Sequence, residues 1–220
     1  MTAPLPEIDG LSIVLLGAFN PRLFTPSWFA RHGLLPESVE AKADVPLINN
    51  DYSSFSTDWC SVEVLPDRFH ISSTTAPAPE QLRDLVVGTF DVLHHVPIHR
   101  VGLNSVAHYM MPSQDVWNSF GHRLAPKETF WDPVLDEAGT LNVTVLGQRK
   151  DQHEGATRVT VEPSSQVAPG IFISTNDDFG QKDPPDTARW AVELISTEWE
   201  PSRARTARIR EHLISRAIES

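Results

Sequence analysis

The stretch from Glu80 to Met111 constrains the fold most, because it joins a helical pattern directly to a strand pattern. Apolar side chains recur at spacings of three and four from Leu82 to Leu93, which predicts an amphipathic helix with one face for a sheet. Two histidines and Pro97 then end the helix. Alternation from Ile98 to Met111 predicts a long strand whose side chains point in turn to opposite faces. The chain therefore contains a helix that packs on a sheet.

Other segments predict further strands and loops around this pair. A continuous apolar run from Leu11 to Leu16 is typical of a buried strand, and Trp59 to Ser73 alternates as a hairpin with a turn at residues 66–68. Three more strands are expected at Leu141–Gln148, Thr157–Glu162 and Gly170–Thr175. The ranges Leu34–Tyr52 and Leu124–Gly139 have little periodicity and are predicted to be loops.

Capping residues predict where the remaining helices begin. Ser113 is placed to cap a short helix that ends at Gly121. Asp186 is placed to cap a longer helix that ends near Pro201, and Ser202 then opens a last helix that runs to the C-terminus.

The order of these elements predicts an α+β fold with antiparallel sheets and helices on one face. Residues 1–97 and 98–220 each contain a strand, a short Pro-Trp helix, a loop, antiparallel strands and a long helix. We therefore expect two α+β halves within one compact unit, the second half ending in an arginine-rich helix. A tandem duplication of this strand–helix–strands–helix unit would give a pseudo-twofold saddle with an open sheet face.

Composition limits the classes of function. The 220 residues have a formal net charge of −11, which makes the binding of nucleic acid phosphates an unexpected main role. The single cysteine, Cys60, lies beside Trp59 in an apolar alternation and is expected to be a buried, reduced thiol, as in a cytoplasmic protein. The early apolar run from Leu11 to Phe19 is too short to span a bilayer, and no secretory leader pattern precedes it.

The run from Val64 to Asn104 carries the one resemblance to a known family. It combines a Leu-Pro-Asp-Arg-Phe hairpin, a helix and the motif His-Arg-Val-Gly-Leu-Asn on the following strand. This combination resembles a sporadically distributed family of uncharacterised bacterial proteins. The resemblance implies no catalytic residue, and such a distribution is compatible with an accessory or defence-associated role. The chain departs from the family pattern at Ser105 and Val106, where an aromatic pair is expected.

Three polar residues are the candidates for catalysis or ligand contact. Asn104 and His108 share one face of the predicted strand, which suits a general base oriented by an amide, although a hydrogen-bonded core histidine is the commoner arrangement. Asp177 lies in an Asn-Asp-Asp run expected just after a strand, where either a cation site or an Asx-type turn is possible.

Two further groups of ionisable residues are candidates for a metal site or an acid–base pair. His94, His95 and His99 form the densest imidazole group, but adjacent histidines at a helix end diverge, so no metal or other cofactor is expected there. Glu63 and Glu162 would serve as an acid–base pair if they faced each other across a sheet.

The last helix carries the clearest charge signal. Its five arginines outnumber its two glutamates in an otherwise acidic chain, and the expected partner-binding residues are Arg203, Arg205, Arg208 and Arg210. The helix could lie on its own acidic body, on a second copy or on a protein partner.

These patterns lead to a functional hypothesis of binding rather than catalysis. No nucleophile elbow, phosphate-binding loop, dinucleotide fingerprint or zinc-protease helix occurs, so whether the protein is an enzyme stays open, with a non-catalytic role favoured. We expect a self-associating or partner-binding scaffold, adaptor or immunity-like module that acts through the open sheet face or the last helix. The alternative is a small-molecule-binding protein or enzyme with a pocket between sheet and helices around His108.

Overall fold

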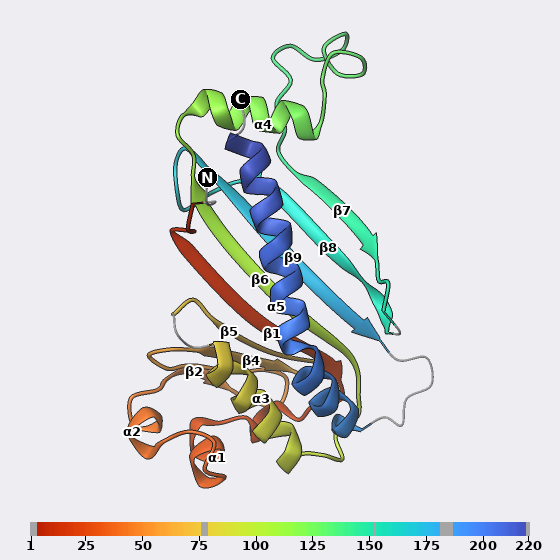
Figure 1. The fold of residues 1–220 in the computed structure, drawn as a ribbon. Helices are drawn as coiled ribbons and strands as arrows, with labels where there is room; N and C mark the ends of the chain where they lie inside the picture. Colours follow the sequence, from red (N-terminus) through yellow and green to blue (C-terminus); the bar gives the residue numbers. More distant parts are fainter. Residues whose placement is uncertain (1–3, 76–78, 152, 181–186, 219–220) are drawn as a thin grey trace.

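A nine-stranded antiparallel sheet forms the body of the protein in a computed structural model that describes residues 4–75, 79–151, 153–180 and 187–218 (Figure 1). The strand order is β2-β3-β4-β5-β1-β6-β9-β8-β7. The strands are β1 Ile8–Gly17, β2 Asp44–Ile48, β3 Ser53–Ser56, β4 Ser61–Leu65, β5 Arg68–Ser73, β6 Ile98–Met110, β7 Val143–Gln148, β8 Glu154–Pro163 and β9 Gly170–Gly180. The helices are α1 Pro26–Arg31, α2 Glu37–Glu40, α3 Pro79–Val92, α4 Gln114–Leu124 and α5 Ala188–Ile218, with a 3-10 turn at Pro21–Leu23. The predicted α+β class is confirmed.

The two long helices α3 and α5 lie on the same face of the sheet (Figure 1). The strands supply alternate apolar side chains to this face, among them Ile13, Ile71 and Leu103, which are all buried. An aromatic cluster closes the first half, in which the Phe69 ring lies 5.3 Å from that of Phe24 and 5.1 Å from that of Phe90. The core therefore sits between the sheet and its helices.

The order of strands is similar on the two sides of the β1–β6 pair, except that the first half has one more outer strand than the second. Strands β1 and β6 pair antiparallel in the middle, with Ile13 opposite Leu103, and the sheet is continuous between the residue ranges 1–97 and 98–220. Outward from this pair lie β5 and β9, then β4 and β8, and each half ends in a long helix on the same face. The antiparallel sheet with both long helices on one face agrees with the prediction, whereas the pseudo-twofold saddle and the origin of the halves by duplication stay predictions.

One helix replaces the two predicted at the C-terminus. Helix α5 continues through Pro201, so the predicted break there is wrong, and Asp186 lies outside the described residues. A proline inside a helix removes one hydrogen bond and disfavours the preceding turn. Here the flanking side chains are fixed by packing, since Trp199 is 2% exposed and Ser202 is 4% exposed. Tertiary contacts therefore override the local signal, and Ser202 is a buried mid-helix residue rather than a cap.

The sequence also missed regular structure in two places. The segment Leu34–Tyr52, predicted to be a loop, contains α2 and β2, and the residues of β2 are mostly exposed, so no alternating pattern marks this edge strand. Strand β9 runs on to Gly180, past the predicted end at Thr175. Asp177 therefore lies inside a strand and not in a turn after it. The Ser113 cap is confirmed, because its Oγ accepts a hydrogen bond from the Val116 amide at 3.2 Å.

Candidate functional site

The three candidate catalytic side chains do not meet. His108 points to the face opposite α5, where its Nδ1 lies 2.8 Å from the Ser164 hydroxyl oxygen and burial lowers the pKa of its imidazole. Asn104 is on that same face and accepts a hydrogen bond from the Asn176 amide. Asp177 points to the opposite face, toward α5. Each side chain has an ordinary structural partner, and because Asp177 faces away from the other two, the three do not share one site among the described residues.

The other groups of ionisable residues are also separate. Among the described residues, no three His, Cys, Asp or Glu side chains are arranged to hold a metal ion. The rings of His94 and His95 meet edge to face at 5.7 Å. Four strands lie between Glu63 on β4 and Glu162 on β8, so the predicted acid–base pair between them is wrong.

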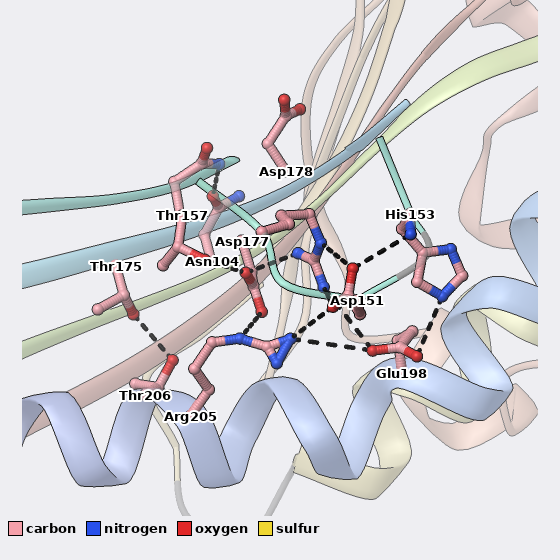
Figure 2. Close-up of polar contacts among 12 residues, drawn as sticks. Asn104, Asp151, His153, Thr157, Thr175, Asp177, Asp178, Glu198, Arg205 and Thr206 are labelled. Carbon is pink, nitrogen blue, oxygen red and sulfur yellow. Dashed lines mark hydrogen bonds and ion pairs between the residues drawn. The ribbon is translucent and has the colours of Figure 1, made fainter. Parts of the chain in front are cut away.

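A cluster of buried charges joins α5 to the sheet and to the β7–β8 turn (Figure 2). Asp177 is at its centre: its Oδ1 accepts hydrogen bonds from Arg149 Nη1 at 2.9 Å and from the Thr157 hydroxyl at 2.7 Å. Its Oδ2 faces Nε of Arg205 on α5 at 3.3 Å, as an ion pair. The side chains of Arg149 and Asp177 are each only 2% exposed. We call this set the buried charge cluster, and its members are Arg149, Asp151, His153, Thr157, Asp177, Glu198 and Arg205.

The charges of this cluster stabilise the packing of α5 on the sheet rather than form a catalytic site. Burial lowers the pKa of Arg149, but Asp151, Asp177 and Glu198 raise it by more, so the guanidinium stays charged. The hydrogen bond from Arg149 in turn lowers the pKa of Asp151. The Cζ atom of Arg149 also lies 3.8 Å from the centre of the Phe179 ring, so the guanidinium makes a cation–π contact as well. Asp177 Oδ2 and Arg205 Nη2 have no hydrogen-bond partner among the described residues, but each lies within ion-pair distance of an opposite charge of the cluster.

The arginines predicted to bind a partner have different surroundings. Arg205 belongs to the buried charge cluster, and Arg210 is 8% exposed and donates to Asp9 and Ser105. Arg203 forms ion pairs with Glu80 and Glu200. Arg208 is exposed on the outer side of α5. The helix therefore lies on its own acidic body, as one of the three alternatives had it, and a partner-binding role for these arginines stays a prediction.

The open face of the sheet is polar along its middle. Paired positions across five strands place Ser72, Ser12, Asn104, Asn176 and Arg158 in one row. Part of this row lines a shallow hollow of about 430 Å³. The face offers many hydrogen-bonding groups, but its central row has no aromatic anchor of the kind that dominates protein interfaces.

An apolar groove, by contrast, lies between α5 and the β7–β8 edge of the sheet. Its volume is about 490 Å³, and Arg208 and His212 stand at its side. Val145 on its floor is 60% exposed although it faces the helix layer. We call this the α5 groove, and its apolar lining consists of Leu124, Val143, Val145, Val159, Val161, Ile209 and Leu213.

The groove is open because the two halves cover their outer strands differently. In the first half, α1 and the turn before it lie over the sheet, and Phe29 packs against Phe55 of β3 with ring centres 5.4 Å apart. In the second half, residues 126–139 project past the end of the sheet and away from β7 and β8 (Figure 1). Val145 of β7 is therefore left without a cover, whereas Val161 of β8 is 4% exposed.

This projecting segment, residues 126–139, which we call the arm, exposes large apolar side chains. Phe130 is 76% exposed, Trp131 49%, Val134 72% and Leu135 52%. Backbone hydrogen bonds give the arm a defined shape, since the amides of Val134 and Leu135 both donate to the Trp131 carbonyl, at 2.9 and 2.8 Å. Large exposed apolar patches are typical of interaction sites and of aggregation-prone surfaces, which makes the arm a candidate binding surface.

The base of the arm is held in place by a buried lysine. Lys127 is 6% exposed, and its ammonium donates to the Ala125 carbonyl and to the Thr140 hydroxyl. Thr140 donates in turn to the Gly121 carbonyl at 2.8 Å. These contacts tie both ends of the arm to the end of α4.

The arm has no helical or alternating period, so its sequence predicted only a loop. The signal was the composition Phe-Trp-Asp-Pro-Val-Leu at residues 130–135, which is too apolar for a solvated loop. The groove had no sequence signal, because it depends on which strand pairs lie outside the reach of a helix.

Comparisons with known proteins do not assign this site. The chain matches no model of a protein family and no curated protein. None of the helices in the described residues is long and apolar enough to cross a lipid bilayer.

Proposed function

We propose that this protein is a protein-binding module that self-associates, with the arm of one copy docked in the α5 groove of a second copy. The observation that carries the proposal is the pairing, on one chain, of an exposed apolar arm with an uncovered apolar groove. Buried aromatic and aliphatic side chains supply most of the binding energy at protein interfaces, and both partners of such a contact are here.

Charge supports the same pairing. The arm carries Glu128, Asp132, Asp136 and Glu137, and its one lysine is buried at the base. The groove is bordered by Arg208 and His212, and by Arg205, whose charge is already paired within the buried charge cluster. An acidic arm and a basic groove attract each other and fix one orientation, which favours this occupant over an unrelated apolar segment. Arg208 thereby keeps the partner-binding role expected from the sequence.

Geometry favours a second copy over the same chain. The arm projects away from β7 and β8 of its own chain (Figure 1), and its base is tied to the end of α4 by Lys127 and Thr140. Two copies related by a twofold axis exchange arms reciprocally, and each dimer then contains two identical arm–groove contacts. Scaffold, adaptor and defence-associated roles are each compatible with such an assembly.

The test is the mass of the protein in solution by light scattering, for the wild type and single variants. We expect the wild type to have twice the 24.5 kDa of the chain at concentrations of tens of micromolar. Trp131→Ser removes an aromatic anchor worth about 2 kcal/mol or more from each of the two contacts, about 4 kcal/mol in all, which weakens the dimer about 1,000-fold. Val145→Glu on the groove floor should dissociate it too.

A matched control comes from the opposite edge of the sheet. Leu47 on β2 is 47% exposed, comparable to the groove valine, but lies far from α5, so Leu47→Glu should leave the dimer intact. Arg208→Glu should weaken the dimer, and Asp132→Arg in the same chain should restore it. A wild type that is monomeric at every concentration, or a Leu47→Glu variant that dissociates as readily as Val145→Glu, would refute the proposal.

A further inference from the structure

The shallow hollow on the open face of the sheet has the dimensions of a small-molecule site. Its volume is about 430 Å³. Its floor includes Gly102 on β6 and Ala156 on β8, two small residues that lie on either side of Asp178, which points away from α5 (Figure 2). Leu16 on β1 and Leu146 on β7 add aliphatic surface. We call this the open-face hollow.

One arginine in the open-face hollow has no partner. Arg158 on β8 is exposed, and it makes no hydrogen bond or ion pair with any residue that the structure describes. The other arginine, Arg100, donates from Nε to Asp178 Oδ1 at 2.8 Å and from Nη2 to Asp178 Oδ2 at 2.5 Å, so its hydrogen-bonding edge is occupied. These two arginines and one aspartate give the hollow a net charge of +1, in a chain whose net charge is −11. An unpaired guanidinium in this position attracts an anion.

Two side-chain amides lie beside the unpaired arginine in the same row of the sheet. Asn176 on β9 is directly opposite Arg158, and Asn104 on β6 is directly opposite Asn176. One hydrogen bond joins the two amides, from Asn176 to the side-chain oxygen of Asn104. Each amide has two N–H donors and an oxygen with two lone pairs, so the pair keeps donors and acceptors for a ligand. Hydroxyl groups match such a pair, because each hydroxyl both donates and accepts.

The lining of the hollow favours a small polar ligand over a protein. No aromatic residue lines it in the part of the chain that the structure describes, so it lacks the anchors that dominate protein interfaces. Its apolar surface is aliphatic and of limited extent, and Leu146, which is 63% exposed, lies opposite Arg158. This surface is suited to the C–H groups of a small ring rather than to a long apolar chain.

From these contacts we infer that the open-face hollow binds a sugar acid, a small carboxylate that carries several hydroxyl groups. The carboxylate accepts two hydrogen bonds from Arg158, and the hydroxyl groups bind the amides of Asn104 and Asn176. The C–H groups of the ring lie against Leu146. This site is on the opposite face of the sheet from α5, and it is separate from the arm and the α5 groove.

Isothermal titration of the full chain with D-glucuronate tests this inference, at a salt concentration of about 0.15 M that screens non-specific attraction. Two probes separate the parts of the ligand: D-glucose has the same ring without the carboxylate, and acetate has the carboxylate without the hydroxyl groups. We expect saturable binding of one glucuronate per chain, and at least about tenfold weaker binding of glucose and of acetate.

Single variants locate the binding site. Arg158→Gln should weaken glucuronate binding at least about tenfold, because it removes a charged pair of donors. Arg68→Gln is the matched control: Arg68 on β5 is exposed on the same face, has no partner among the described residues and lies outside the hollow, so binding should not change. Trp131→Ser on the arm should also leave glucuronate binding unchanged, whatever it does to the dimer.

One variant should bind more tightly than the wild type. Asp178→Ala removes the carboxylate of the hollow and frees Arg100, so glucuronate should bind several-fold more tightly. A purely structural role of the polar row predicts no such gain. The inference would be overturned by the absence of saturable glucuronate binding, by equal binding of glucose or acetate, or by an Arg68→Gln variant that loses as much affinity as Arg158→Gln.

Discussion

Neighbouring aspartates on β9 should differ sharply in their importance for stability. Asp177 points into the buried charge cluster, where it contacts two arginines and a threonine. Asp178 points to the other face and pairs with Arg100, whose side chain is 46% exposed. The two substitutions Asp177→Ala and Asp178→Ala therefore remove the same atoms from one strand, on opposite faces of one sheet.

The expected magnitudes follow from burial. Removing one partner of a buried ion pair costs about 3–5 kcal/mol, because a buried charge is left without compensation. Asp151 still neutralises Arg149, which places Asp177→Ala near the lower end, at about 3 kcal/mol. An exposed pair contributes about 0–1 kcal/mol, since water and salt screen it, so Asp178→Ala should cost no more than about 1 kcal/mol.

Urea unfolding followed by circular dichroism measures both values, and thermal unfolding checks them. For a chain of this length each kcal/mol lowers the midpoint by about 2–4 °C, so Asp177→Ala should lose about 6–12 °C. Asp177→Asn keeps the shape and some hydrogen bonds and should fall between the two alanine variants. If the free energies of unfolding of the two alanine variants differ by less than about 1 kcal/mol, the buried charge cluster does not stabilise the packing of α5 as we claim.

Two further predictions concern other ionisable groups. Burial raises the pKa of the Cys60 thiol to about 11, so a thiol reagent at pH 8 should react with the folded chain far more slowly than with the urea-unfolded chain; equal rates would contradict burial. The hydrogen bond from Arg149 lowers the pKa of Asp151 below that of the unfolded chain, so its carboxylate stabilises the fold above about pH 4 and this contribution is lost as the pH falls through the lower folded pKa. The difference in unfolding midpoint between wild type and Asp151→Asn should therefore be largest near pH 7 and shrink toward pH 2.5, whereas a constant difference would refute the pairing.

The parts of the fold that sequence predicts are those in which local pattern and tertiary packing agree. The helix before Pro97 and the strand that follows it appear as α3 and β6, because their apolar spacing matches the face that they bury. At Pro201 the two disagree, and packing of the surrounding turns prevails over the missing hydrogen bond. Edge strand β2 gave no pattern, because neither of its faces is buried.

The candidate sites depended on information that sequence does not contain. The sequence identifies Asp177 as a candidate carboxylate but not its partners, because Arg149 follows β7 and Arg205 lies on the distant helix α5. Proximity of that kind follows from strand order, which local patterns do not determine. The arm could be found from its composition, whereas the groove exists only once the sheet and α5 are assembled.

Cross-linking between two different single-cysteine chains tests the proposed exchange of arms most directly. Asp136→Cys places a thiol on the arm, and Gly147→Cys places one on β7 near the groove, where a side chain meets only ordinary contacts. The buried Cys60 should not interfere. With a short bismaleimide, we predict that a mixture of the two variants yields a cross-linked heterodimer, and that Trp131→Ser in the arm-labelled chain prevents it. A cross-link that forms only within a chain carrying both cysteines, and never in the mixture, would contradict the account.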